Sequence, residues 1–156
     1  MTTQTSLEPV VKTITVRCPQ QRAFDVFTAH MGSWWPVTRF SIAADEGTSE
    51  VIDVRIDPME GGRCYEVRAD GSEADWGHVV AWEPPSRVAM SWNPTRRAQP
   101  STEWEVVFTA EGPDATRVVL THAGWERLGE AGPEARESYL TGWDGVLRLY
   151  AARAEG

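Results

Sequence analysis

The spacing of apolar residues changes once along this chain, and the order of the two patterns limits the folds open to it. Six consecutive segments alternate apolar and polar residues and are separated by short turns: 50–57, 63–68, 76–82, 87–92, 102–110 and 116–122. Strands joined in this way pair with antiparallel neighbours. The segment 133–153 instead places apolar residues on one stripe of a helix, namely Tyr139, Trp143, Val146, Leu147 and Tyr150. We therefore expect an antiparallel sheet covered by one long amphipathic helix.

The first part of the chain adds a strand and two short helical segments. Residues 10–17 alternate in the manner of a strand, and Pro19 occupies a position favoured at the start of a helix. Apolar residues recur at helical spacing as far as His30, and 33–36 predicts a second short helix or turn. The predicted class is α+β: a curved antiparallel sheet of about seven strands wrapped on the long C-terminal helix, with two short helices after the first strand. Residues 1–8 are predicted to be a disordered tail and 9–156 a single domain.

Composition disfavours several classes of partner. The formal net charge is −8, which argues against nucleic-acid binding because that function needs a basic patch. No apolar run approaches the length of about 18 residues needed for membrane insertion, and the N-terminus lacks a signal-peptide pattern. The two cysteines, Cys18 and Cys64, do not form a disulfide framework. A cytoplasmic location with reduced thiols is the expectation.

Eight tryptophans in 156 residues are more than a core of this size needs. They are Trp34, Trp35, Trp76, Trp82, Trp92, Trp104, Trp125 and Trp143. Each such ring can bury roughly 150–250 Å² and carries one polar tip that requires a partner. The excess is compatible with rings that line a cavity and equally with a tryptophan-rich core that has some rings on the surface.

A series of short motifs occurs in a fixed order over about residues 10–150. They are Pro19-x-x-x-Ala23-Phe24, Trp34-Trp35-Pro36, Gly61-Gly62-Arg63-x-Tyr65-Glu66, Asp75-Trp76-Gly77-x-Val79, Trp82-Glu83-Pro84-Pro85-x-Arg87, Ser91-Trp92, Thr116-Arg117-Val118 and Gly142-Trp143-x-x-Val146-Leu147. With this series the chain resembles the START-like (SRPBCC) superfamily, which has the helix-grip fold. Within it, the chain is similar to the bacterial branch related to the activator of the heat-shock-protein-90 ATPase. Cys64 departs from the pattern, since relatives often carry Trp after Gly-Gly-Arg.

The resemblance implies a hydrophobic cavity between the long helix and the sheet. Superfamily members bind lipids, sterols, hormones or polyketides, and a few are cyclases or other enzymes. We therefore expect this chain to bind a small hydrophobic or amphipathic molecule there, with no cofactor. The predicted lining is Phe27, Trp34, Val54, Glu66, Trp76, Val79, Met90, Trp104, Val106, Leu120, Tyr139, Trp143 and Val146.

An enzyme of cyclase or hydrolase type is the first alternative, with Glu66 and His78 as weak catalytic candidates. A cavity-facing Glu66 would have a raised pKa and could act in acid/base chemistry, but the alternation does not decide between cavity and solvent. His78 lies between two tryptophans on one predicted strand. The three histidines are widely spaced, and the sequence has neither a His-x-x-x-His nor a Cys-x-x-Cys pair, so it does not predict a metal site.

The second alternative is a chaperone-partner or stress-response interaction module, which would need a large exposed apolar patch.

Two local features of the sequence can each be interpreted in two ways. Gly142, next to Trp143, indicates close approach of another group to the helix or simply tight helix–sheet packing. Residues 123–132 form either a lid with Trp125 as its flap or an ordinary connection.

Overall fold

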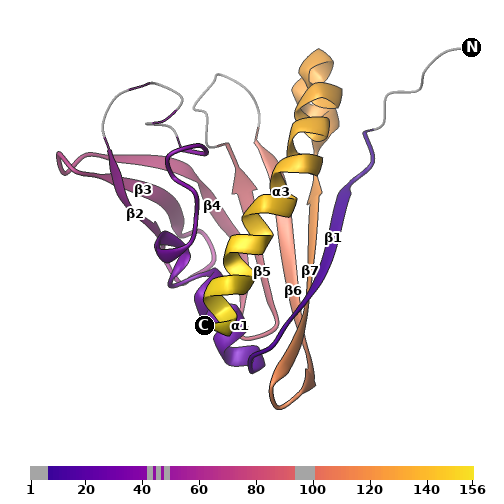
Figure 1. Cartoon of the computed structure of the whole chain (residues 1–156). Coiled ribbons are helices and arrows are strands. Elements are labelled where there is room, and N and C mark those ends of the chain that lie inside the picture. Colours follow the sequence, from indigo (N-terminus) through magenta and orange to yellow (C-terminus); the bar gives the residue numbers. More distant parts are fainter. Residues whose placement is uncertain (1–6, 42–43, 45–46, 48–49, 94–100) are drawn as a thin grey trace, which may run out of the picture.

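The computed structural model describes residues 7–41, 44, 47, 50–93 and 101–156, and in these a seven-stranded antiparallel sheet curls around a long C-terminal helix (Figure 1). The strand order is β1-β7-β6-β5-β4-β3-β2. The strands are β1 (Val10–Val16), β2 (Val51–Ile56), β3 (Arg63–Arg68), β4 (Glu73–Glu83), β5 (Arg87–Trp92), β6 (Thr102–Gly112) and β7 (Ala115–Ala123). This is the helix-grip fold that the sequence predicts. The predicted tail, 1–8, lies outside the described residues except for Leu7 and Glu8.

Two of the strands, β3 and β5, have the predicted bounds, whereas β4 begins earlier than the predicted residue 76. In its first residues Glu73 pairs with Val67 and Ala74 pairs with Glu66, so the ladder continues toward the β3–β4 turn. The prediction missed these residues because acidic side chains flank a single small apolar residue, Ala74, which is buried. A pattern with one small inward residue gives little periodic signal.

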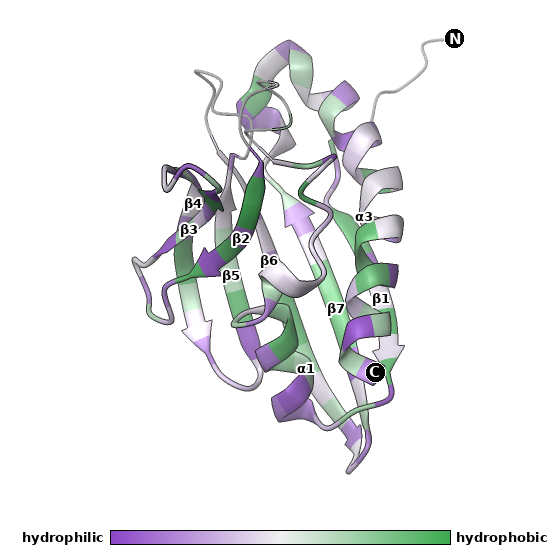
Figure 2. Cartoon of the chain, turned by 60° about the vertical axis from the view of Figure 1, so that its left-hand side comes forward, coloured by the Kyte–Doolittle hydropathy of each residue, from purple (hydrophilic) through white to green (hydrophobic). Residues whose placement is uncertain are grey.

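The helical segments are α1 (Gln20–Phe27), η1 (Met31–Ser33), η2 (Trp125–Ala131) and α3 (Gly132–Glu155). Helix α3 crosses the concave face of the sheet and buries the predicted stripe: Trp143, Val146, Leu147 and Tyr150 are buried, and Tyr139 is partly buried. Figure 2 shows hydrophobic segments along the strands and hydrophilic segments on α1 and at the outer edge of α3. The core therefore lies between the sheet and α3.

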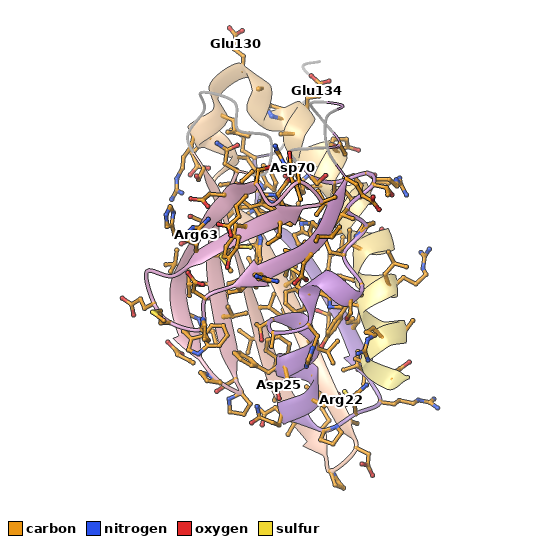
Figure 3. All side chains as sticks on the ribbon, turned by 90° about the vertical axis from the view of Figure 1, so that its left-hand side faces the viewer. Arg22, Asp25, Arg63, Asp70, Glu130 and Glu134 are labelled. Carbon is orange, nitrogen blue, oxygen red and sulfur yellow. The ribbon has the colours of Figure 1, made fainter. Side chains whose placement is uncertain are left out.

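The interior has two ends, which Figure 3 marks with Glu130 and Glu134 at one and Arg22 and Asp25 at the other. At the α1 end, the Tyr150 hydroxyl donates to the carbonyl of Ala23, and the Arg22 guanidinium donates to the last carbonyls of α3. At the other end β7 runs into η2 and α3 begins; we call it the η2 end. Because neighbouring strands are antiparallel, the ends of β3 and β5 meet the starts of β4 and β6 here.

Within the part of the chain that the structure describes, no helix combines the length and the apolar character that crossing a bilayer would require.

Candidate functional site

Five tryptophan rings meet between the sheet and α3 toward the η2 end, and we call them the tryptophan cluster. They are Trp35, which follows η1, Trp76 of β4, Trp92 of β5, Trp104 of β6 and Trp143 of α3. Each has at most 7% of its surface exposed. Consecutive rings lie with centroids 5.4–6.2 Å apart and mostly edge to face. Such contacts stabilise by about 0.5–1.5 kcal/mol each beyond the burial of area.

Trp35 has a special position because it belongs to neither the sheet nor the long helix. Its ring centroid lies 5.5 Å from that of Trp76, 5.5 Å from that of Trp92 and 5.9 Å from that of Trp143. Its indole N–H donates to the carbonyl of Phe40, five residues further along the same segment, at 2.8 Å. The ring of a connecting segment thus bridges the sheet and α3 at this level.

The indole N–H groups of the cluster differ in their partners. That of Trp76 donates to Glu66 Oε1 at 2.8 Å, and that of Trp143 donates to His122 Nδ1 at 3.0 Å. The indole N–H groups of Trp92 and Trp104 are buried, and neither makes a hydrogen bond of ordinary geometry with the described residues, although the hydroxyl of Tyr139 lies beside the indole of Trp92. A buried donor without a partner costs about 1–3 kcal/mol.

Glu66 faces the interior. The alternation of residues along its strand had left open whether it faces the interior or the solvent. Its side chain is fully buried, and its second carboxylate oxygen accepts from Arg68 Nε at 2.9 Å. The two residues are two positions apart on β3 and so share one face of the strand. The interior at this edge therefore holds a carboxylate that is neutralised by an arginine and fixed by the indole of Trp76.

His122 is the one fully buried histidine among the described residues, and its hydrogen bonds define its tautomer. An indole N–H only donates, so Nδ1, which faces Trp143, must carry the lone pair. The proton is then on Nε2, which donates to the hydroxyl of Thr102 at 2.7 Å. That hydroxyl donates in turn to the carbonyl of Trp92 at 3.3 Å. Burial lowers the pKa of His122 to about 3, so the imidazole is neutral at ordinary pH.

The predicted lining residues all lie in the interior. Trp76, Trp104 and Trp143 belong to the tryptophan cluster, and Phe27 and Trp34 connect it to the ring of Tyr150 nearer α1, because Phe27 also contacts Trp104 and Trp34 also contacts Trp35. The others are Val54, Glu66, Val79, Met90, Val106, Leu120 and Val146, which are buried, and Tyr139, which is partly buried. Ligand contact by any of them stays a prediction.

Sequence reasoning did not select Trp35, Trp92, Thr102 or His122 for the site. A signal existed for Trp92 and His122, since each continues the inward phase of a lining residue two positions earlier, Met90 and Leu120. Trp35 gave no such signal, because the direction of a ring in a connecting segment depends on the path of that segment.

Three further residues that the sequence analysis named, His78, Trp125 and Gly142, lie outside the tryptophan cluster or are held by contacts within the protein. His78 is exposed, away from the tryptophan cluster. Trp125 is fully buried, stacks at 4.3 Å on His122 and donates its N–H to the carbonyl of that histidine at 3.1 Å, so the predicted flap is anchored in the interior. At Gly142 an added Cβ would meet, among the described residues, the ring of Phe40 alone, at an ordinary 3.9 Å.

An open groove of about 500 Å³ lies outside the tryptophan cluster, between the end of α1 and strands β2, β3 and β4. Three of its carboxylates already have partners: Asp25 accepts from Gln21, Asp53 pairs with Arg55, and Asp57 accepts from the backbone of Arg63. In the described part of the chain, no group of three or more His, Cys, Asp or Glu side chains could hold a metal ion.

The sequence profile of one protein family matches most of the chain. The family is described as Activator of Hsp90 ATPase homolog 1-like protein, and its profile matches residues 17–148. A comparison with curated proteins found no match.

Several solved structures have a similar fold. One is described as an anthrahydroquino-gamma-pyrone synthase complexed with SUM; it is 27% identical over 99% of this chain and 91% of that chain, with a TM-score of 0.56. The self-sacrificing resistance protein CalC from Micromonospora echinospora is 24% identical over 95% and 94% of the two chains, with a TM-score of 0.68. A protein from Mesorhizobium loti is 16% identical over 92% and 94%, with a TM-score of 0.66.

Proposed function

Because this chain belongs to the family of Activator of Hsp90 ATPase homolog 1-like proteins, we propose that it binds a small hydrophobic or amphipathic molecule between its sheet and α3. Two comparisons support small-molecule binding. The family profile matches residues 17–148, which include most of the sheet and most of α3, and one structure 27% identical to this chain is described as a synthase complexed with SUM.

The placement of Trp35 is the observation that carries the proposal. The sheet and α3 contribute Trp76, Trp92 and Trp143 to this level of the interior, and the ring of Trp35 lies against all three. Its indole N–H is bonded within its own segment, at Phe40, and not to the sheet or to α3. A flat apolar ligand could replace this ring and recover the same edge-to-face contacts, while the two main layers stay where they are.

An enzyme of cyclase type is a second candidate, and the burial of Glu66 favours it. A carboxylate inside an aromatic interior is a common source of acid/base chemistry. In this structure, however, Glu66 is bonded to both Arg68 and Trp76, so it would have to exchange a partner before it could take a proton from a ligand. Binding without chemistry is therefore the simpler proposal.

The interaction-module alternative receives less support. The large apolar side chains that are exposed in the described residues are Leu7, Val11, Phe40, Ile52, Met59, Val80 and Leu149. They come from β1, β2, β4, α3 and several connecting segments, and a partner surface needs a contiguous patch.

The test of the binding proposal compares the wild type with Trp35→Ala, using Phe24→Ala as the matched control. Phe24 is also buried, but it belongs to α1 and packs on Trp82 and Phe108. Each substitution should lower the free energy of unfolding by about 3–5 kcal/mol, because each removes a buried aromatic ring. Native mass spectrometry of freshly purified protein and equilibrium dialysis with a panel of polycyclic aromatics, steroids and fatty acids give the readout.

We expect panel members to bind the wild type, Trp35→Ala to bind the best of them more tightly, and Phe24→Ala to leave its dissociation constant unchanged. The tighter binding follows because the ligand no longer has to displace the Trp35 ring. A wild type and a Trp35→Ala variant that both carry no copurified mass and bind no panel member would refute the proposal.

A further inference from the structure

The segment 35–41, which lies between η1 and β2, is held together mainly by its own hydrogen bonds. The Trp35 indole donates to the carbonyl of Phe40. Further donors of the segment bind carbonyls within it: Val37 N–H binds Trp35, Arg39 N–H and Phe40 N–H bind Pro36, and the Ser41 hydroxyl binds Val37. Among the described residues, 36–41 form no hydrogen bond with the sheet, with α1 or with α3. Moving the segment as one body would therefore break few polar contacts.

Apolar contacts hold this segment against the rest of the protein. In Figure 1 the chain that follows η1 runs between β2 and α3. Trp35 is buried in the tryptophan cluster, and Val37 is partly buried against the core. Phe40 reaches α3, where the tip of its ring lies 3.9 Å from the position that a Cβ would take at Gly142. Close approach of another group at this glycine is one of the two interpretations that the sequence left open, and Phe40 is that group.

Trp34, the residue immediately before the segment, is fixed to α1. Its indole N–H donates to the carbonyl of Val26 at 2.7 Å, and its ring centroid lies 5.3 Å from those of Phe27 and Tyr150. The backbone N–H of the next residue donates to the carbonyl of Met31 in η1. The chain is therefore anchored up to this point, and backbone rotation after it can swing the segment while α1 stays in place.

We propose that residues 35–41 form a gate to the interior, which opens as one unit when Phe40 leaves Gly142 and Trp35 leaves the tryptophan cluster. This rests on the proposed function and adds how its site opens. The two rings contact adjacent positions of α3, Gly142 and Trp143, so the long helix holds the gate shut at both contacts. Trp35 fills the site, and Phe40 is the latch, whose ring is 37% exposed and therefore releases more readily than a buried one.

Hydrogen exchange of the protein without ligand tests the opening. Nuclear magnetic resonance follows the indole N–H of individual tryptophans, and the exchange rate of Trp35 is compared with those of Trp76 and Trp143 at low urea concentrations. Phe40→Ala removes the latch, and Phe24→Ala is the matched control, which removes a buried ring of α1 instead. Stopped-flow fluorescence then measures the rate at which 1-aminoanthracene, an uncharged probe, enters; where that probe does not bind, the panel member that binds best replaces it.

We expect Trp35 to exchange at least about 10-fold faster than Trp76 and Trp143, at a rate that low urea leaves unchanged, because a local opening exposes little surface. Phe40→Ala should speed the exchange of Trp35 by about 10-fold, since it removes a partly buried ring contact. Entry of the probe should quicken by a similar factor, because it depends on the open population. Phe24→Ala should speed only the exchange that requires unfolding, that of Trp76 and Trp143, and should not change the rate of entry.

The outcomes separate the gate from the binding function. If Trp35 exchanges with the same urea dependence as Trp143, the segment opens only on unfolding, and the gate inference is overturned whether or not a ligand binds. If Phe40→Ala leaves the exchange of Trp35 unchanged, or speeds it without speeding entry of the probe, the inference is also overturned, while the binding function stands. If neither 1-aminoanthracene nor any member of the wider panel binds, the proposed function fails, and the gate, which then has nothing to admit, fails with it.

Discussion

Replacing His122 by glutamine should remove much of the acid sensitivity of this protein. The imidazole is neutral and fully buried, with Nδ1 accepting from Trp143 and Nε2 donating to Thr102. Burial lowers its pKa to about 3, whereas an unfolded chain binds a proton at this residue below about pH 6.5. Between those two values the unfolded state holds more protons, so the free energy of unfolding falls as the pH is lowered.

The size of the effect follows from the width of that window. Each pH unit below about 6.5 costs about 1.4 kcal/mol, so lowering the pH from about 6.5 to about 4.5 costs roughly 2.7 kcal/mol through this residue alone. The contribution is fully present above pH 6.5 and is lost as the pH falls toward 3. At neutral pH, His122→Gln should cost about 1–3 kcal/mol, because the indole N–H of Trp143 loses its acceptor.

Urea denaturation followed by tryptophan fluorescence, at several pH values from about 7.5 to about 4.5, measures the cost of the substitution at neutral pH and the change of stability with pH. The difference between wild type and His122→Gln should shrink by roughly 2.7 kcal/mol over this range, so the two stability curves should converge as the pH falls. The carboxylates titrate in both proteins, so their effect cancels in the difference. The same substitution at His78, which is exposed, is the matched control for replacing a histidine outside the interior. A constant difference for His122→Gln would refute the assignment of a buried neutral imidazole.

Three further substitutions or treatments have defined outcomes. Gly142→Ala should raise the free energy of unfolding in urea by about 0.5–1 kcal/mol, since among the described residues its Cβ meets the Phe40 ring alone, at an ordinary distance; a loss of stability would contradict this. Glu66→Gln should lower the free energy of unfolding by about 3–5 kcal/mol, because it removes one charge of the Glu66–Arg68 pair. Adding Arg68→Met should recover much of that loss, and equal losses in the single and double variants would show that the pair is not coupled. Burial raises the pKa of the Cys64 thiol, so it should react with a disulfide reagent at pH 8 only after unfolding, and rapid reaction in the native protein would contradict its burial.

The alternation of apolar residues was sufficient to predict the strands because each strand has one face on the core. Strands β3 and β5 have the predicted bounds, and the buried stripe of α3 is the predicted one. The order of these elements then identified the helix grip, since a sheet with one apolar face needs a cover and only one long helix follows it.

The facing of Glu66 shows where this reasoning ends. On β3 one phase carries Cys64 and Glu66 and the other carries Tyr65 and Val67, so each phase offers both an apolar and a polar or small residue. The structure buries the first phase. It can do so because Arg68, on the same face, neutralises the carboxylate, and an indole from the neighbouring strand donates to it. The pattern along β3 alone contains no information about the indole of Trp76, which lies on β4.

The sequence by itself determined the elements of this protein, their order and the face of the long helix that is buried, because these depend on neighbours a few residues apart. Only the tertiary structure decided that Trp35 bridges the two layers, that His122 is neutral with its proton on Nε2, and that the indole N–H of Trp104 lacks an acceptor among the described residues. Each of these facts is a contact, or a missing contact, between residues from different elements. Such contacts are created when the sheet curls around α3, and no spacing within a single segment encodes them.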